Sequence, residues 1–227
     1  HAPGVPVVYR TATEKLSNPE RLNLDRRGLK ACPVLEGEER LRLLNYQNNA
    51  ISFVANLHNL PNLIFLDLYS NQIRQISGLE AVPTLRVLML GKNLIAKIER
   101  LDALSKLDVL DLHCNHVKRI EGLSRLYELR VLNLAGNQIE VVDGAVSPAT
   151  SPATRRRPAD AASECMYAAQ ALHGLSALTE LNLRRNAISS VSALEALPSL
   201  QRLFLSNNAV AALSAIACLG AVPTLLE

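Results

Sequence analysis

The chain has 227 residues, of which 48% are apolar and only 4% are aromatic, with no tryptophan. It is long enough for one or two ordinary domains, and its core must be large and mainly aliphatic. The net charge of +3 is too small to indicate nucleic-acid binding. The four cysteines are scattered without close pairs, which favours reduced cytosolic thiols over a disulfide framework or a zinc ribbon.

The first forty residues differ from the rest of the chain. Residues 1–12 precede any periodic pattern, so we expect a flexible N-terminal tail there. The chain begins with His1 and has no cleavable signal pattern, so we expect a piece of a longer protein. Residues 13–40 predict a degraded capping repeat, because Leu22 and Leu24 fit a strand but Arg27 stands where later units have asparagine. Terminal repeats are often atypical because they cover an apolar end.

A 22-residue period governs residues 41–219. It is plain when "LIFLDLYSNQIRQISGLEAV" from Leu63 is compared with "LRVLMLGKNLIAKIERLDAL" from Leu85. In every unit a leucine lies five residues before a fixed asparagine, and apolar residues lie two and five residues after it. This pattern of seven units is that of leucine-rich repeats, with the asparagines Asn49, Asn71, Asn93, Asn115, Asn137, Asn186 and Asn208.

Each unit predicts one turn of a coil. The alternating leucines indicate a short strand with one face inside the coil. The asparagine can both donate and accept, so stacked asparagines are expected to form a ladder that satisfies the buried turns. Apolar residues at every third position after it favour a short 3₁₀ or extended return. We therefore predict an α/β solenoid: a leucine-rich-repeat horseshoe with a concave parallel β-sheet and short 3₁₀ or extended convex returns.

Two segments depart from the period. Residues 145–171 are an insertion rich in Pro, Ala, Ser and Thr, which predicts a disordered low-complexity loop that leaves the sheet uninterrupted. Residues 220–227 break register without a polar cap, so we expect the start of a missing C-terminal cap or a continuation. The uncharged run 209–226 is just long enough to be a candidate membrane span, but its apolar residues fall on repeat positions, so we predict no membrane association.

The sequence offers no catalytic, cofactor or metal site. It contains no phosphate-binding loop, no dinucleotide fingerprint and no nucleophile elbow. His113, Cys114 and His116 lie close together in "LDLHCNHV", but a short exposed turn without a fourth ligand is not a preformed tetrahedral site. We therefore predict a noncatalytic protein without cofactor or metal.

The outward strand positions predict a binding face, because solenoids bind partners on their concave side. Several of these residues are apolar or aromatic where water is expected, which indicates a contact surface; the alternative is ordinary solvated residues. The face is expected to be mildly acidic in the middle and basic toward the C-terminus. Its predicted members are Phe65, Asp67, Tyr69, Met89, Lys92, Asp111, His113, Arg184, Arg185, Arg202 and Phe204.

The 22-residue pattern resembles the leucine-rich-repeat subfamily of the phosphatase-1 regulatory type, which includes many axonemal and ciliary proteins. The segment "NPERLNLDRRGLKACPVLEGEERLRLLNYQNNAI", residues 18–51, further resembles the leucine-rich-repeat subunit family of the tubulin polyglutamylase complex. The resemblance covers residues 18–219 except the insertion. Its specific part is "LDRRGLKACP", because the repeat does not dictate that sequence.

This resemblance implies a noncatalytic scaffold or adaptor. The family's complex adds glutamate chains to tubulin tails through a separate ATP-dependent ligase subunit. The implied partners are ligase-complex subunits, tubulin or microtubules, or axonemal proteins, with no nucleic acid. The implied location is the cytoplasm and cytoskeleton, at a cilium or flagellum axoneme or a basal body. The alternatives are a structural axonemal protein and, with less support, a phosphatase regulatory subunit.

Overall fold

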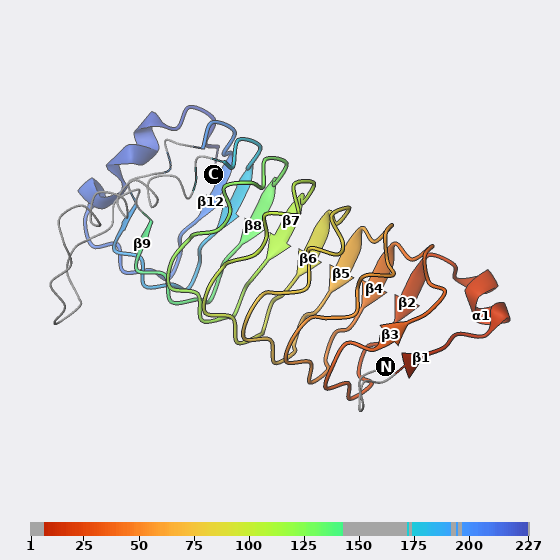
Figure 1. Ribbon diagram of the computed structural model, residues 1–227. Helices are drawn as coiled ribbons and strands as arrows, with labels where there is room; N and C mark the ends of the chain where they lie inside the picture. The colour runs from red at the N-terminus through yellow and green to blue at the C-terminus, as the bar shows by residue number, and fades with distance from the viewer. Residues whose placement is uncertain (1–6, 143–171, 173, 192–193, 195–196, 227) are drawn as a thin grey trace, which may run out of the picture.

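The computed structural model describes residues 7–142, 172, 174–191, 194 and 197–226. The chain winds through successive coils that lie side by side, and each coil adds one strand to a sheet running along the molecule (Figure 1). The two ends of the chain lie at opposite ends of this solenoid. The predicted parallel-sheet solenoid is therefore confirmed.

The main sheet has eight strands, all parallel, in the order β12-β10-β8-β7-β6-β5-β4-β2. Each strand is three residues long and is centred on the first inward leucine, and the second inward residue follows directly after the strand. Their bounds are Arg21–Asn23 (β2), Leu43–Asn45 (β4), Phe65–Asp67 (β5), Val87–Met89 (β6), Val109–Asp111 (β7), Val131–Asn133 (β8), Glu180–Asn182 (β10) and Arg202–Phe204 (β12).

The strands align in one register, so that equivalent leucines are paired across the sheet. Leu66, Leu88 and Leu110 are fully buried, as are most of the leucines at the second inward position. Leu132 pairs with Leu181 in the same register, although 49 residues separate Asn137 from Asn186 where other units have 22. The insertion therefore does not interrupt the sheet, and residues 145–171 themselves lie outside the described part of the chain.

The returns are built from 3₁₀-type bonds and close backbone contact. The Leu60 N–H donates to the Leu57 carbonyl at 3.1 Å, and the same bond recurs in later coils. Gly78 adopts φ of +70°, and a Cβ there would lie 2.4 Å from the Val54 carbonyl oxygen of the preceding coil. Two small parallel sheets also form, β1 (Val7–Val8) with β3 (Val34–Leu35) and β9 (Val141–Val142) with β11 (Ser190–Val191).

The N-terminal end corrects one expectation. A flexible tail was expected over residues 1–12, but its second half is ordered: β1 pairs with β3, and helix α1 (Ala12–Ser17) begins at the end of the expected tail. The helix is fixed by a reciprocal cap, in which the Thr11 hydroxyl accepts the Glu14 N–H and the Glu14 carboxylate accepts the Thr11 N–H. Residues 1–6 lie outside the described part.

A buried ion pair fastens this end to the first coil. The Arg10 guanidinium donates to both carboxylate oxygens of Glu38, and the two side chains are 9% and 2% exposed. Arg10 also donates to the Asn18 carbonyl at 2.6 Å, which ties the end of α1 to the same residue. The hydrogen bond to Glu38 raises the pKa of Arg10 above its ordinary value. The degraded unit therefore joins an ordered cap in which polar groups are paired.

The last coil differs from the expectation in its return path. The return forms a 3₁₀ helix, η2 (Leu213–Ala221), at the blue end of Figure 1. Leu213 falls on an inward repeat position in the sequence, but it is 84% exposed. This return is a continuous nine-residue 3₁₀ helix, whereas the earlier returns contain only short 3₁₀-type turns. The 22-residue spacing therefore no longer fixes which side chains point inward.

Residues 220–227 also correct the expected loss of register. The Leu226 N–H donates to the Gln201 carbonyl at 2.8 Å, so this segment hydrogen-bonds along the last coil. The Thr224 hydroxyl donates to the Leu200 carbonyl at 2.7 Å, a bond that recurs in an earlier coil. The segment therefore repeats the approach to a strand, displaced in sequence by the longer helical return. Residue 227 lies outside the described part.

Among the described residues, no helix has both the length and the apolar composition that a bilayer crossing requires.

Candidate binding face on the sheet

Three rows of side chains form the solvent side of the main sheet, because every coil repeats the same strand in the same register. The first row holds the first residue of each strand, the second row the third residue, and the third row the residue two places further on. The three rows have different physical roles.

The first row is apolar across five neighbouring strands. Its members are half-buried although they face away from the core, because they cover one another across the sheet. Phe65 was the only one predicted as a binding residue. The signal for the others was a hydrophobic residue immediately before the first inward leucine, repeated every 22 residues. We call these residues the apolar row: Leu43, Phe65, Val87, Val109 and Val131.

The second row corrects the expected acidic centre. Asp67 and Asp111 are only 5% and 7% exposed. Each accepts the backbone N–H two residues further on, from Tyr69 at 3.0 Å and from His113 at 2.9 Å. Asparagines at the same position close the same turn in other coils. These carboxylates therefore stabilise the strand exits and offer little acidic surface to a partner. Met89 and Phe204, half-buried members of this row, lack such an oxygen.

The asparagine ladder lies just behind the face. Asn115 Nδ2 donates to the carbonyls of Leu112 and Leu90 at 3.0 and 2.9 Å, and its Oδ1 accepts the Ile95 N–H at 2.9 Å. One side chain thus closes its own turn and joins it to the preceding coil. The corresponding bonds to the turn of the coil and to the preceding coil are made by Asn49, Asn71, Asn93, Asn137, Asn186 and Asn208.

A left-handed residue precedes the ladder asparagine in every unit with a described turn, and this geometry presents side chains to solvent. Lys92, Cys114 and Arg185 have φ of 51°, 53° and 54°. The predicted binding residues Lys92 and Arg185 are therefore exposed on the exit turns of β6 and β10. Asparagine, serine and glycine occupy the same position in other coils, and the recurring asparagine and glycine were a sequence signal for this conformation.

An aromatic and cationic cluster forms on the exit turns of the middle coils. The Tyr69 and His113 rings lie 5.6 Å apart, and Lys92 Nζ lies 5.2 Å from the Tyr69 centroid. Gly91 leaves room for the His113 ring, because a Cβ there would be 2.4 Å from His113 Cε1. The hydrogen-bonding interaction with Tyr69 raises the pKa of the Lys92 amine. The middle of the face is thus aromatic and basic rather than acidic.

The C-terminal part of the face is basic, and it is partly neutralised. The Arg184 guanidinium stacks on Phe204 at 4.4 Å from the ring centroid. Arg202 pairs with Glu180 of the neighbouring strand at 2.7 Å. Arg184 and Arg185 therefore carry the accessible positive charge there, and Arg202 is balanced within the protein.

The two histidines of "LDLHCNHV" make separate contacts. His113 Nδ1 lies 2.7 Å from Asp111 Oδ1, and His116 approaches Gln138 instead. Within the described ranges, no three His, Cys, Asp or Glu side chains are grouped so that they could hold a metal ion. The face combines apolar, aromatic and cationic groups, which is the chemistry of a protein contact.

Comparisons with known proteins agree with the repeats. Residues 83–139 and 168–210 match the family described as "Leucine rich repeat", and residues 39–81 match "Leucine Rich repeats (2 copies)", so the matches cover more than half of the chain. The human and mouse proteins named leucine-rich repeat-containing protein 49 are 46% identical over 63 residues, which is 28% of this chain. That match spans only 9% of the length of those relatives.

Solved structures share the fold. Internalin C2 of Listeria monocytogenes aligns with a TM-score of 0.70 and 24% identity, over 96% of this chain and 83% of that one. The leucine-rich-repeat part of FLRT2, from an octameric complex with Latrophilin 3 and Unc5D, aligns with a TM-score of 0.64 and 26% identity, over 83% and 52% of the two chains. By its repeats and by its fold, this chain belongs to the leucine-rich-repeat proteins.

Proposed function

We propose that this chain is a noncatalytic scaffold within a tubulin-modifying assembly of the polyglutamylase type. The observation that carries the scaffold role is the continuous parallel sheet, whose outer face presents the apolar row beside the Tyr69 cluster. A long, regularly spaced face of this kind suits an extended contact with another protein. The described residues offer no paired nucleophile and base on it.

The choice of assembly rests on the first unit. Residues 18–51 resemble the polyglutamylase subunit family, and the identity to leucine-rich repeat-containing protein 49 supports the same grouping. The proposed partners are ligase-complex subunits and tubulin, at microtubules, cilia or basal bodies. Cytoplasmic and cytoskeletal localisation is part of the same proposal.

Purification of the native assembly through a tag on this chain tests the proposal. We expect a glutamate ligase activity toward tubulin to co-purify with it. A phosphatase catalytic subunit in its place would support a regulatory role, and retention on salt-washed axonemes without ligase activity would support a structural axonemal protein. Either result would overturn the polyglutamylase assignment.

Charge reversal tests whether the sheet face makes the contact. The double variant Arg184→Glu and Arg185→Glu removes the accessible positive charge and leaves the Arg202–Glu180 pair intact. We expect partner capture to fall by about fivefold or more, because interface charges set complementarity. Lys118→Glu with Arg119→Glu makes the same charge change beyond the strand exit. Equal capture by both double variants would exclude this part of the face as the interface.

A further inference from the structure

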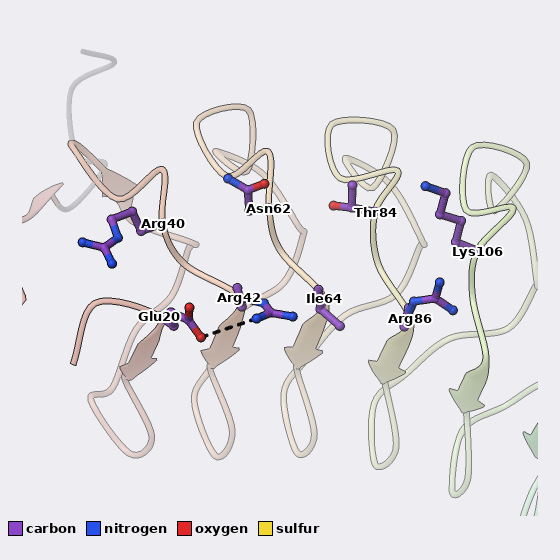
Figure 2. Close-up of a pocket in the computed structure, with 8 residues that line it drawn as sticks. All are labelled: Glu20, Arg40, Arg42, Asn62, Ile64, Thr84, Arg86 and Lys106. Carbon is purple, nitrogen blue, oxygen red and sulfur yellow. Dashed lines mark ion pairs between the residues drawn. The ribbon is translucent and has the colours of Figure 1, made fainter.

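A groove lies along the leading edge of the sheet, where the chain approaches β4, β5 and β6. It holds about 510 Å³, and neighbouring coils line it in two rows (Figure 2). The lower row in Figure 2 lies beside the strand starts, and the upper row lies on the loops that precede them. The rows are Glu20, Arg42, Ile64 and Arg86, then Arg40, Asn62, Thr84 and Lys106. We call this the leading-edge groove.

The charge of the leading-edge groove is one-sided. Four of its eight lining residues are cations and one is an anion. Arg42 faces Glu20 at 3.7 Å with both side chains about half exposed, which is a weak and solvent-screened pair. Arg40 and Lys106 form no ion pair with any residue that the structure describes. The groove therefore carries positive charge that the described fold leaves unneutralised.

The neutral polar groups of the groove are already used by the scaffold. The Asn62 amide donates to the Glu39 carbonyl at 2.8 Å, and the Thr84 hydroxyl donates to the Leu63 carbonyl at 2.9 Å. Ile64 is half-buried between Arg42 and Arg86. What the groove offers a ligand is therefore two cations without an ion pair among the described residues, Arg40 and Lys106. Arg42 and Arg86 beside the half-buried Ile64 are exposed and only weakly paired, with Glu20 and Glu128. This combination selects carboxylates on an extended chain rather than a neutral polar ligand.

The repeat also sets the length of such a ligand. Neighbouring strands lie about 4.8 Å apart, so Arg40 and Lys106, three coils apart, are separated by roughly 14 Å. An extended peptide advances about 3.3 Å per residue and would span this distance with four or five residues. The excess of positive charge ends at this side of the groove, because Arg86 pairs with Glu128 at 3.3 Å and Asp108 pairs with Arg130.

We propose that the leading-edge groove binds an acidic, extended peptide segment of another protein, with carboxylates paired to Arg40, Arg42, Arg86 and Lys106. A nucleic acid fits less well, because the groove has no aromatic side chain for base stacking and its basic stretch ends at Glu20 and Glu128. The inference does not depend on the tubulin assignment, since it uses only the chemistry of the groove.

Fluorescence anisotropy with the intact chain and a labelled decaglutamate peptide tests this proposal, with decalysine, decaglutamine and a mixed-sequence RNA decamer as comparison ligands. The groove variant carries Arg40→Gln, Arg42→Gln, Arg86→Gln and Lys106→Gln. The matched control variant carries Arg74→Gln, Lys97→Gln, Lys118→Gln and Arg119→Gln, which removes the same charge outside the groove. We expect the groove variant to bind decaglutamate about tenfold more weakly or worse, and the control to change far less.

A single position gives a second, sign-dependent readout. Ile64→Lys adds a cation to the groove and should strengthen decaglutamate binding, whereas Ile64→Glu should weaken it. Both variants should fold, because a long charged side chain can reach solvent from this half-buried position. Equal losses in the groove and control variants, or no difference between the two Ile64 variants, would overturn the site. Tighter binding of the RNA decamer would overturn the ligand class. Because the peptide is synthetic, a negative result in this binding experiment does not contradict the scaffold proposal. Failure to isolate a ligase with the native assembly likewise does not contradict the peptide site.

Discussion

The coil that carries β7 and the coil that carries β12 have nearly the same repeat pattern but very different burial. Leu110, at the first inward position of β7, is fully buried, whereas Leu203, its counterpart in β12, is half-buried. β7 has strand neighbours on both sides, and β12 pairs with β10 alone. In this pair of coils, the consensus leucine is fully buried only where a coil lies on each side of it.

The polar residues of the two coils show the same contrast. Asn115 and Asn208 make equivalent hydrogen bonds, and each accepts an N–H from the preceding coil at about the same distance. Asn115 is 4% exposed, but Asn208 is only half-buried, so water can replace the hydrogen-bond partners of Asn208. The same bond is thus expected to contribute more stability in the middle of the solenoid than at its C-terminal coil.

The largest expected effect comes from truncating the equivalent leucines. Leu110→Ala should lower the free energy of unfolding by about 2–5 kcal/mol, because it leaves a cavity among fully buried neighbours. Leu203→Ala should cost about half as much or less, since its side chain already contacts solvent. Urea denaturation of both variants measures the difference. Equal losses would show that the C-terminal coil is as tightly packed as the middle ones.

The asparagine ladder gives an intermediate effect. Asn115→Ala should lower the free energy of unfolding by about 1–3 kcal/mol, because it leaves the Ile95 N–H buried without a partner. It also removes one of the two amide donors to each of the Leu90 and Leu112 carbonyls, which keep their bonds from Asn93 and Asn137. Asn208→Ala should cost less, for the reason given above. Asn115→Asp separates the two roles of the side chain. It keeps an acceptor oxygen for the Ile95 N–H but replaces the amide donor with a carboxylate oxygen facing the carbonyls. An unchanged melting midpoint for Asn115→Ala would contradict the ladder's role.

The 22-residue period was sufficient to predict the features that every coil repeats. The inward leucines, the parallel sheet and the position of Asn115 all follow from one spacing, because identical units can stack in only one register. Features that depend on contacts outside the period could not be found in this way. The pairing of Val7 with Val34 is such a contact, as is the exposed position of Leu213 in the helical return.

The outward side-chain positions on the sheet were predictable from the period, but the contacts among these side chains were not. Tyr69, Lys92 and His113 were placed on the correct side of the strand, but their mutual contacts depend on the left-handed turns and on Gly91. Asp67 has the outward position of a binding residue, and only the backbone geometry reveals that its carboxylate is used by the Tyr69 N–H. The leading-edge groove was missed because its residues precede the strands and become neighbours only across coils.

The smallest expected effect compares two ion pairs that join neighbouring coils. Asp108 accepts a hydrogen bond from Arg130 Nε at 2.6 Å, which lowers the pKa of Asp108 from its ordinary value of 3.8. Its contribution to stability is therefore present above pH 3.8 and is lost as the pH falls toward the lower folded-state pKa. Arg130 is 63% exposed, so solvent screens the pair, and Asp108→Asn should lower the melting midpoint at neutral pH less than Asn115→Ala does. This difference from the parent chain should vanish as the pH is lowered through this range, and a difference that persists at all pH values would show that the charge is not its cause.

Glu180→Gln, which removes the 2.7 Å pair with Arg202 next to the last coil, should move the midpoint still less, because β12 has a neighbour on one side only.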